Sequence, residues 1–404
     1  MSTSKFDRRD LFKSAGAAAI AMPAASYSRV LGANSRIRFG LIGAGGRGRH
    51  ITKHLIDTGR TECAAICDVY AARIDEAGAL APGAKSYGDH RKLLEETESL
   101  DAVMVGTPDH QHAGITIDAL NAGKDVYVEK PLTRTIAEGL PIVRAARVNG
   151  RVCQVGMQQR SGMHYRKAKE EYIDSGRLGT ITHIRTIWHS GAGPSRRDRD
   201  PNMPQPSNLD WARYLGPVKW REWDPPQYFS FRSYLDFGGG KITDFFAHWG
   251  DAVHMMMDRD DPVAASAEGG VFYRQDGRDA PDTIHILWKY RGGYTVSFES
   301  ATGVHLPPYG IHFFGTEGRL FIDRKYYEFF PAGEETAAEK FETEENITRA
   351  HVENFLDCCE SRKHPNGDVY FGHRGAMASH LGVISYKQGR RIEFDPEREE
   401  ILPG

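Results

Sequence analysis

The segment RIRFGLIGAGGRG at residues 36–48 decides the fold of this chain. Its first half, Arg36–Ile42, is predicted to form a short buried strand, and Arg49–Thr58 is predicted to form a helix. A G-x-G-x-x-G pattern between a strand and a helix allows a tight turn and brings helix N–H groups close to a pyrophosphate. The segment therefore predicts a dinucleotide-binding loop, in which the candidate cofactor-binding residues are Gly43, Gly45, Gly46, Arg47 and Gly48.

A carboxylate follows the second predicted strand, Glu62–Cys67. Asp68 stands about 20 residues after the last glycine of the loop, which suits a hydrogen bond to the ribose 2′-hydroxyl of a dinucleotide. Because a carboxylate repels a 2′-phosphate, the sequence favours NAD over NADP. Arg73 is a counter-indication, since its charge could pair with such a phosphate. Asp68 could also cap the helix that begins near Ala71, and the two roles can coexist.

Strands and helices continue to alternate along the N-terminal part of the chain. Further strands are predicted at Asp101–Val105, Val126–Val128 and Val152–Val155, and helices at Ala113–Ala122 and Ile136–Asn149. Alternation with short connections is typical of an α/β fold with a parallel, doubly wound sheet. We therefore expect an NAD-binding Rossmann domain over residues 35–155.

Three short motifs accompany this pattern. They are the Gly43–Gly48 loop, Thr107-Pro108 with His112, and Glu129-Lys130-Pro131 after Gly123-Lys124. Together they resemble the Gfo/Idh/MocA family of oxidoreductases (glucose–fructose oxidoreductase, inositol dehydrogenase and MocA). The resemblance implies a C-terminal α/β domain over residues 156–400, with a large open, mainly antiparallel sheet that often mediates oligomerisation. It also implies cofactor-binding roles for Thr107, Pro108, His112 and Glu129.

Lys130 stands at the carboxyl end of a predicted strand, where cofactor and substrate meet in this type of sheet. In the family that the chain resembles, the matching lysine contacts the substrate and takes part in proton transfer. Pro131 can fix the turn that follows, with a cis peptide bond in relatives. A solvated surface lysine is the alternative, and the Glu-Lys-Pro context disfavours it.

A second informative segment, FGGGKITDFFAHWGD, occupies residues 237–251. It predicts a glycine-rich loop followed by a helix, on which Asp244, His248 and Asp251 share one face. The resemblance implies an Asp-x-x-x-His pair here, with His248 as the acid–base group. Asp244 would then orient His248 or bind a substrate hydroxyl. An imidazole suits proton transfer from an alcohol near neutral pH.

A metal site is the rival interpretation of this cluster, because His and carboxylate side chains can bind zinc. His254 is the one further donor nearby in the sequence. Nicotinamide chemistry needs no metal, so no metal is expected. A histidine that simply packs on a helix face is the remaining alternative.

The C-terminal part of the chain alternates as an antiparallel sheet does. Predicted strands cover Thr182–Ile187, Ala264–Val271, Thr283–Tyr290, Tyr294–Glu299, Ile311–Gly315 and Arg319–Ile322, with a hairpin turn at Gly315–Gly318 and helices at Ile347–Arg362 and Phe371–Gln388. Glu334–Glu345 is predicted to be a solvated acidic stretch. Aromatic residues crowd the stretch 188–234, where they could stack on a sugar ring or pack inside the protein. Arg232 and His189 are possible substrate contacts.

The first thirty residues are predicted to be a twin-arginine (Tat) export signal. Arg8-Arg9 is followed by Leu-Phe-Lys and then by a short, Ala-rich apolar stretch. This stretch is too short for a membrane-spanning helix, so no membrane anchor is expected. We therefore expect a periplasmic or secreted protein that uses the Tat export machinery. An ordinary amphipathic helix with two chance arginines is the alternative.

The composition excludes several classes of protein. The 404 residues include 52 Lys and Arg against 54 Asp and Glu, which gives a net charge of −2. The chain therefore lacks the excess positive charge that is typical of proteins that bind nucleic acid. Five cysteines are an odd and small number for a chain of this length, so a disulfide framework is not expected.

These observations predict an NAD-dependent oxidoreductase that acts on CH–OH groups of a sugar, polyol or glycoside. Lys130, His248 and Asp244 are its catalytic candidates. Because free NAD is scarce outside the cytoplasm, we expect the cofactor to stay tightly bound and to be recycled. A glycosidase or lyase that works by transient NAD-dependent oxidation is the alternative, and a non-catalytic sugar-binding protein of the same fold is a second one. A homo-oligomer is expected from the resemblance.

Overall fold

The structure is a computed structural model that describes residues 36–97, 99–191, 200–258, 261–304 and 309–403. The predicted export signal at residues 1–30 lies outside the described residues. Residues Ile37–Gly404 pack as one compact unit. Within the described residues, no helix is long and apolar enough to cross a membrane.

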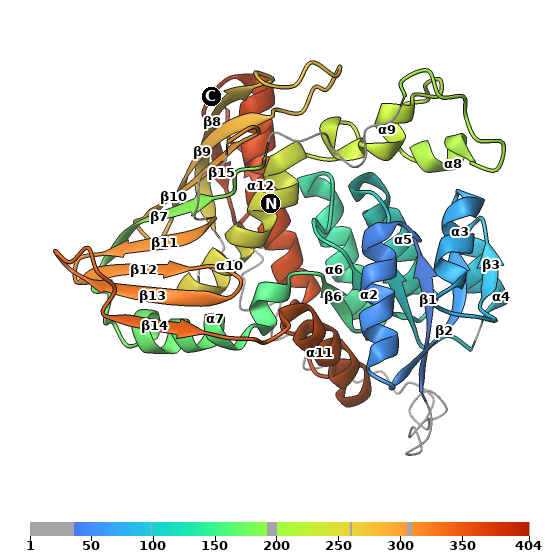
Figure 1. Ribbon diagram of the computed structural model, residues 1–404, viewed down its shortest axis with the longest axis horizontal. Helices are drawn as coiled ribbons and strands as arrows, with labels where there is room; N and C mark the ends of the chain where they lie inside the picture. The colour runs from blue at the N-terminus through green and yellow to red at the C-terminus, as the bar shows by residue number, and fades with distance from the viewer. Residues whose placement is uncertain (1–35, 98, 192–199, 259–260, 305–308, 404) are drawn as a thin grey trace, which may run out of the picture. The chain divides into compact units, whose positions relative to one another are not determined.

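The first part of this unit is a six-stranded parallel sheet with the strand order β3-β2-β1-β4-β5-β6 (Figure 1). Its strands are β1 (Ile37–Ile42), β2 (Thr61–Cys67), β3 (Lys85–Tyr87), β4 (Ala102–Val105), β5 (Asp125–Val128) and β6 (Cys153–Val155). The helices that alternate with them are α2 (Gly46–Asp57), α3 (Ala71–Gly78), α4 (His90–Glu96), α5 (Asp109–Asn121) and α6 (Gly139–Val148). The predicted doubly wound Rossmann fold is confirmed. Its strand order reverses between β1 and β4, which is where such sheets bind ligands.

The second part is a ten-stranded sheet with the order β14-β13-β12-β11-β7-β10-β9-β8-β15-β16. Its strands are β7 (Ile181–Ile187), β8 (Pro262–Gly270), β9 (Thr283–Tyr290), β10 (Thr295–Ala301), β11 (Gly310–Gly315), β12 (Gly318–Ile322), β13 (Tyr326–Pro331), β14 (Glu339–Glu342), β15 (Ile392–Asp395) and β16 (Glu400–Ile401). The sheet is mainly antiparallel, as predicted, and Gly315 pairs with Gly318 across the predicted hairpin. One pair differs: β7 and β10 run parallel.

Further helices connect and cover the two sheets. The longer ones are α10 (Ala247–Met257), α11 (Ile347–Ser361) and α12 (Val369–Gln388). The shorter ones are η2 (Ile136–Glu138), η3 (Gln158–Ser161), α7 (Met163–Ala168), η4 (Lys169–Asp174), α8 (Trp211–Leu215), α9 (Pro225–Phe229), η5 (Phe231–Ser233) and η6 (Ile242–Phe246). Of these, η4 and η6 are π-helical turns.

Two details were not predicted from the sequence. The stretch Glu334–Glu345 is solvated as predicted, since none of its residues is buried, but it also contains β14, which pairs with β13 at the edge of the sheet. An edge strand can carry charges because one of its sides meets no other strand. The helix predicted from Ala113 begins four residues earlier, at Asp109, because Pro108 provides an extended N-cap and Asp109 suits the first turn.

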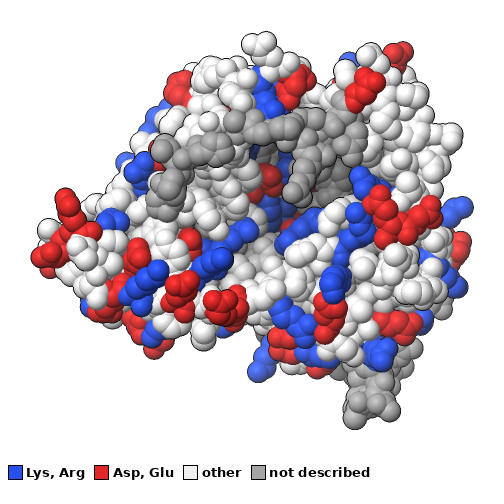
Figure 2. Space-filling view, in the orientation of Figure 1, with Lys and Arg blue, Asp and Glu red and all other residues white. Residues whose placement is uncertain are grey.

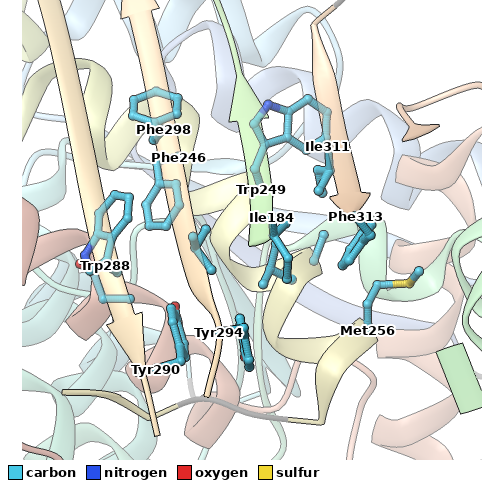
Figure 3. Close-up of a cluster of buried hydrophobic side chains, with 14 of the residues drawn as sticks. Ile184, Phe246, Trp249, Met256, Trp288, Tyr290, Tyr294, Phe298, Ile311 and Phe313 are labelled. Carbon is cyan, nitrogen blue, oxygen red and sulfur yellow. Dashed lines mark hydrogen bonds between the residues drawn. The ribbon is translucent and has the colours of Figure 1, made fainter. Parts of the chain in front are cut away.

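The main core lies between the ten-stranded sheet and the helices η6, α10 and α12 (Figures 1 and 3). Alternate residues of β9 are buried, so one face of the strand meets this core. The Phe246 and Trp288 rings stack in it at 4.0 Å between centroids. Because η6 leads directly into α10, this packing fixes the helix that carries Asp244 and His248.

Candidate functional site

The glycine loop leaves open space in front of helix α2. Gly43 has φ +90°, and a Cβ on Gly48 would lie 2.0 Å from the Gly43 carbonyl oxygen, so these two positions need glycine. A Cβ on Gly45 or Gly46 would meet no atom within 4 Å. No side chain caps the helix N-terminus at Gly45. Its first N–H groups therefore lack a side-chain acceptor and face a space that a pyrophosphate fits.

Asp68 connects the end of β2 to this loop. Its carboxylate accepts hydrogen bonds from the N–H groups of Ala44 (2.7 Å) and Tyr70 (2.9 Å). Burial raises the pKa of Asp68 to about 6. The N-cap of α3 is Tyr70 rather than Asp68, so the simple capping role does not hold. Arg73 pairs with Glu76 at 2.8 Å, which partly neutralises the charge that could have favoured a 2′-phosphate.

The Thr107-Pro108 turn follows β4, beside the loop. The Thr107 hydroxyl is buried and has no hydrogen-bond partner among the described residues. Such an orphaned group is suited to a ligand. The ring nitrogens of buried His112 lie 2.7 Å from the Pro131 carbonyl oxygen and 2.9 Å from that of Thr107. His112 therefore connects the Thr107-Pro108 turn to the turn at Pro131 through their backbone carbonyl oxygens.

The Glu129-Lys130-Pro131 turn follows β5 and has a cis bond between Lys130 and Pro131. Arg47 donates to the Glu129 carboxylate at 2.8 Å, so this turn contacts the glycine loop. The Lys130 side chain reaches across to the C-terminal part of the chain. Its Nζ donates to the backbone oxygen (2.6 Å) and to Oδ1 (2.8 Å) of Asp244.

Asp244 lies in the π-helical turn η6 and faces two cations. Besides Lys130, Arg232 contacts its carboxylate at 2.9 Å. The sequence interpretation had Asp244 either orienting His248 or binding a substrate hydroxyl, and the structure places Lys130 and Arg232 against its carboxylate. Arg232, named from the sequence only as a possible substrate contact, therefore belongs to this cluster.

His248 lies near the start of helix α10, in the same site, and is 8% exposed. Its ring stacks on Trp188 at 5.8 Å between centroids, and its Nδ1 has no hydrogen-bond partner among the described residues. Burial, followed by the charges of Lys130 and three arginines, holds the pKa of His248 well below the usual value for histidine. The imidazole is therefore neutral at pH 7 and able to accept a proton.

The other polar residues of this helix point elsewhere. Asp251 is fully buried and accepts hydrogen bonds from Arg160 Nε at 2.8 and 3.0 Å. His254 Nε2 lies 2.6 Å from the Tyr290 hydroxyl oxygen, inside the core. The residues that the structure describes contain no group of three or more His, Cys, Asp or Glu that could hold a metal ion.

Most aromatic residues of the stretch 188–234 pack against each other rather than in the site. Six of them pack into one cluster, together with Phe237, Leu215, Val218 and Val69. The six are Trp211, Tyr214, Trp223, Tyr228, Phe231 and Tyr234. Its backbone is tied to the end of β2, where Asp210 N–H donates to the Val69 carbonyl at 2.9 Å. Trp188 differs, since it stacks beside His248. His189 accepts the Ala301 N–H at 3.1 Å, so its Nδ1 faces strand β10.

Sequence reasoning missed Arg324, beside Trp188, and Tyr165, in the helix that packs on the Arg324 turn. Arg324, in the turn between β12 and β13, lies with Cζ 5.0 Å from the centre of the Trp188 ring. Tyr165, in α7, is fully buried, and its hydroxyl has no hydrogen-bond partner among the described residues. Neither residue stands in a motif, and Arg324 comes to lie beside Trp188 only through the tertiary fold.

Comparison with known proteins agrees with this geometry. The "Oxidoreductase family, NAD-binding Rossmann fold" matches residues 37–157, and the "Oxidoreductase family, C-terminal alpha/beta domain" matches residues 188–403. Inositol 2-dehydrogenase of Salmonella typhimurium is 33% identical over 146 residues, 35% of this chain and 43% of that protein. A glycosyl hydrolase family 109 protein of Solibacter usitatus is 28% identical over 240 residues, 53% of this chain and 55% of that protein. The chain thus spans about half the length of these curated relatives.

Solved structures share the fold along nearly the whole chain. An aldose-aldose oxidoreductase from Caulobacter crescentus has a TM-score of 0.70 at 19% identity, over 89% of this chain and 100% of that one. A levoglucosan dehydrogenase in complex with NADH and levoglucosan has a TM-score of 0.69 at 19% identity, over 89% of this chain and 99% of that one. This chain belongs to the Gfo/Idh/MocA family of oxidoreductases, whose N-terminal domain is an NAD-binding Rossmann fold.

Proposed function

We propose that this protein oxidises a CH–OH group of a sugar, polyol or glycoside with a nicotinamide dinucleotide. One observation carries the proposal. Lys130, at the carboxyl end of β5, is held by Asp244 beside the neutral imidazole of His248. A charged donor and a neutral base near the carboxyl ends of the Rossmann strands are what removal of a hydroxyl proton requires.

The three catalytic candidates have distinct roles in this proposal. His248 accepts the proton of the substrate hydroxyl. The Lys130 ammonium donates a hydrogen bond to the hydroxyl oxygen and stabilises the negative charge that develops there. Asp244 holds Lys130 in place, and Arg232 limits how far Asp244 can move. The cofactor, when bound, supplies the hydride acceptor.

The residues that would hold the cofactor surround the open space at helix α2. Gly45 and Gly46 admit the pyrophosphate, and the orphaned Thr107 hydroxyl offers a polar contact. Asp68 remains the candidate for the ribose hydroxyls, which supports NAD over NADP. Arg47 and Glu129, paired with each other, connect the loop to the turn that carries Lys130.

Retention of the cofactor is part of the proposal. The aromatic cluster around Trp211 and Tyr228 packs on the segment after Asp68, which supports a covered adenosine end. We further propose export through the Tat route, on the basis of Arg8-Arg9, because a resident cofactor would then cross with the folded protein. Loss of the dinucleotide during gel filtration would contradict this part of the proposal.

A second candidate is glycoside cleavage by transient oxidation, elimination, addition of water and re-reduction. The similarity to a family 109 glycosyl hydrolase protein supports it. Both candidates share the first proton removal and hydride step, so the same three side chains serve either. Release of free sugar from a glycoside without lasting cofactor reduction distinguishes the second from the first.

Replacement of Lys130 by Met separates an enzyme from a sugar-binding protein of the same fold. We expect Lys130→Met to lower the rate of cofactor reduction about 100-fold or more, the usual range for loss of a donor that stabilises developing negative charge, while the protein stays folded by circular dichroism. Lys85→Met, on the exposed edge of β3, is the matched control and should keep full activity. Equal activity of both variants would refute the assigned role.

A further inference from the structure

The cationic side chains around His248 differ in how they are neutralised. The charges that lower the pKa of His248 come from Lys130, Arg324, Arg47 and Arg232. Lys130 and Arg232 share the Asp244 carboxylate, and Arg47 pairs with Glu129. Arg324 makes no ion pair or hydrogen bond with any described residue, and its Nε is buried without a partner. In Figure 2, Lys and Arg side chains also gather beside a hollow near the middle of the face shown.

The position of Arg324 is fixed by its neighbours. The carbonyl oxygen of Asp323, the preceding residue, lies 2.9 Å from His164 Nε2, which ties the turn between β12 and β13 to helix α7. The Arg324 guanidinium lies over Trp188, and Trp188 stacks on His248. Arg324 is thus held at the edge of the proposed hydride-transfer site, with its guanidinium over an aromatic ring and no hydrogen-bond partner for its N–H donors among the described residues.

Tyr165 adds a second donor without a described partner, in the helix that holds the Arg324 turn. It follows His164 in α7, is fully buried, and its hydroxyl has no partner among the described residues. Burial raises the pKa of Tyr165 and the nearby Arg324 charge lowers it, and the Tyr309 ring lies 5.4 Å from that of Trp188 between centroids. His248 Nδ1 and Arg324 Nε are thus orphaned on the two side chains that contact Trp188, and the Tyr165 hydroxyl is orphaned in the helix that holds the Arg324 turn. Buried polar groups of this kind are satisfied by a ligand or by water.

The hydrogen-bond donors of Arg324 and Tyr165 favour an anionic ligand. A guanidinium presents several N–H groups in a fork that matches the oxygens of a carboxylate or a phosphate, and a phenol hydroxyl can donate beside it. A neutral sugar would leave the Arg324 charge without a counter-ion, which is costly in a half-buried position. We propose that Arg324 and Tyr165 form a subsite for an anionic group of the substrate, so that the protein acts on an acidic sugar derivative. The proposal rests on the proposed oxidoreductase function and makes it more specific.

The test compares neutral and acidic forms of the same sugar by calorimetry on the full protein with its cofactor. Glucose, glucuronate and glucose 6-phosphate form one set, galactose and galacturonate another, and inorganic phosphate is the minimal probe. We expect at least one acidic sugar to bind about 10-fold or more tightly than its neutral counterpart, as for a charge-assisted hydrogen bond. Whether the carboxylate or the phosphate ester binds better identifies the source of the anion. Equal or tighter binding of the neutral sugars, or no binding of any anion, would overturn the proposal.

Variants test whether the tighter binding of acidic sugars comes from this subsite. Arg324→Gln should weaken the acidic sugar about 10- to 100-fold and leave the neutral sugar unchanged, and Tyr165→Phe should act in the same direction more weakly. Arg319→Gln is the matched control, because Arg319 also lies over an aromatic ring, that of Phe330, in the neighbouring strand β12. Loss of the cofactor from Arg324→Gln, or equal weakening of both sugars, would overturn the assignment.

Binding and turnover also separate this inference from the function on which it rests. If an acidic sugar binds through Arg324 but never reduces the cofactor in the unaltered protein, the proposed oxidoreductase function fails and the anion subsite stands. If neutral sugars are oxidised and acidic sugars are neither bound nor oxidised, the subsite fails and the oxidoreductase function stands.

Discussion

At the scale of single residues, His248 differs from an exposed histidine in its lowered pKa. Burial is the first cause of its lowered pKa, and the nearby cations add to it. A solvent-exposed imidazole is half protonated near pH 6.5. His248 stays neutral at that pH and remains a proton acceptor in mildly acidic solution.

The pH dependence of cofactor reduction tests this placement. As the pH falls, the rate should decline only once His248 itself takes up a proton, so the acidic limb should have an apparent pKa below about 6.5. The measurement is a single-turnover rate between about pH 5 and pH 8. His248→Asn should remove the limb together with most of the activity. An acidic limb centred above pH 7 would contradict the role of His248 as the base.

Gly45 offers a separate test of the cofactor loop. A Cβ at this position meets no protein atom within 4 Å, and its φ of −64° is open to alanine. Gly45→Ala should therefore fold normally but weaken dinucleotide binding about 10-fold or more, because the methyl group occupies the space of the pyrophosphate. Gly114→Ala, an equally open position in α5, is the control. Unchanged cofactor affinity in Gly45→Ala would place the pyrophosphate elsewhere.

Motifs determined what could be predicted for single residues. Lys130 and Asp244 were identified because each stands in a short pattern with a fixed spacing, and the structure brings them within 2.8 Å of each other. The partnership itself was not predicted, since it joins residues that are far apart in the sequence. Arg324 has no pattern around it and reaches the site only because a strand turn of the second sheet packs against α7.

At the scale of secondary-structure elements, helix α11 ties the last part of the chain to the Rossmann sheet. The Nε2 of fully buried His351 lies 2.9 Å from the Val155 carbonyl oxygen, and its Nδ1 lies 2.7 Å from the Ser161 hydroxyl. Burial lowers the pKa of His351 to about 4. An unfolded chain would protonate this histidine near pH 6.5, whereas the folded protein resists protonation.

This difference predicts how stability depends on pH. The unfolded state binds more protons than the folded state between pH 6.5 and about 4, so the free energy of unfolding should fall as the pH falls through that window. His351→Asn should cost about 1–3 kcal/mol at pH 7 through its lost hydrogen bonds and should reduce the slope below pH 6.5. Urea unfolding at several pH values measures both effects. An unchanged slope in His351→Asn would refute the account.

The periodicity of hydrophobic residues predicted the strands and helices that bury one face. It did not predict the elements that lack a buried face. Strand β9 alternates buried and exposed residues and was found almost to the residue. Strand β14 has three exposed residues of four, so it shows no alternation to detect. The π-helical turn η6 also has no sequence signature, although it sets the direction of Asp244.

At the scale of the whole molecule, the outer face of the ten-stranded sheet bears on the proposed homo-oligomer. Strand β9 exposes His285, Leu287 and Lys289 on the face opposite the core, and Leu287 is 46% exposed. We expect Leu287→Glu to weaken self-association about 10-fold, as measured by sedimentation equilibrium. Val148→Glu, at the end of α6 and 75% exposed, is the control. An unaltered assembly in Leu287→Glu would mean that copies associate through another surface.

The order of strands in the sheets could be predicted only in part. The Rossmann order follows from alternation of strands and helices together with the right-handed crossover rule. The second sheet joins β7 to both β10 and β11, which stand more than a hundred residues later in the chain. Pairings over such separations depend on which faces are buried together, and a single sequence does not specify this.

The central claim is that His248 accepts a proton from a substrate hydroxyl while Lys130 stabilises the charge on its oxygen, in a site where a nicotinamide cofactor would supply the hydride acceptor. The most direct measurement is the absorbance of the purified protein as neutral sugars, acidic sugars and glycosides are added without free NAD. The account predicts that reduced nicotinamide appears with at least one of them, or that free sugar is released from a glycoside, and that Lys130→Met shows neither. Absence of both signals from the unaltered protein while it carries the cofactor, or equal signals from Lys130→Met, would contradict it.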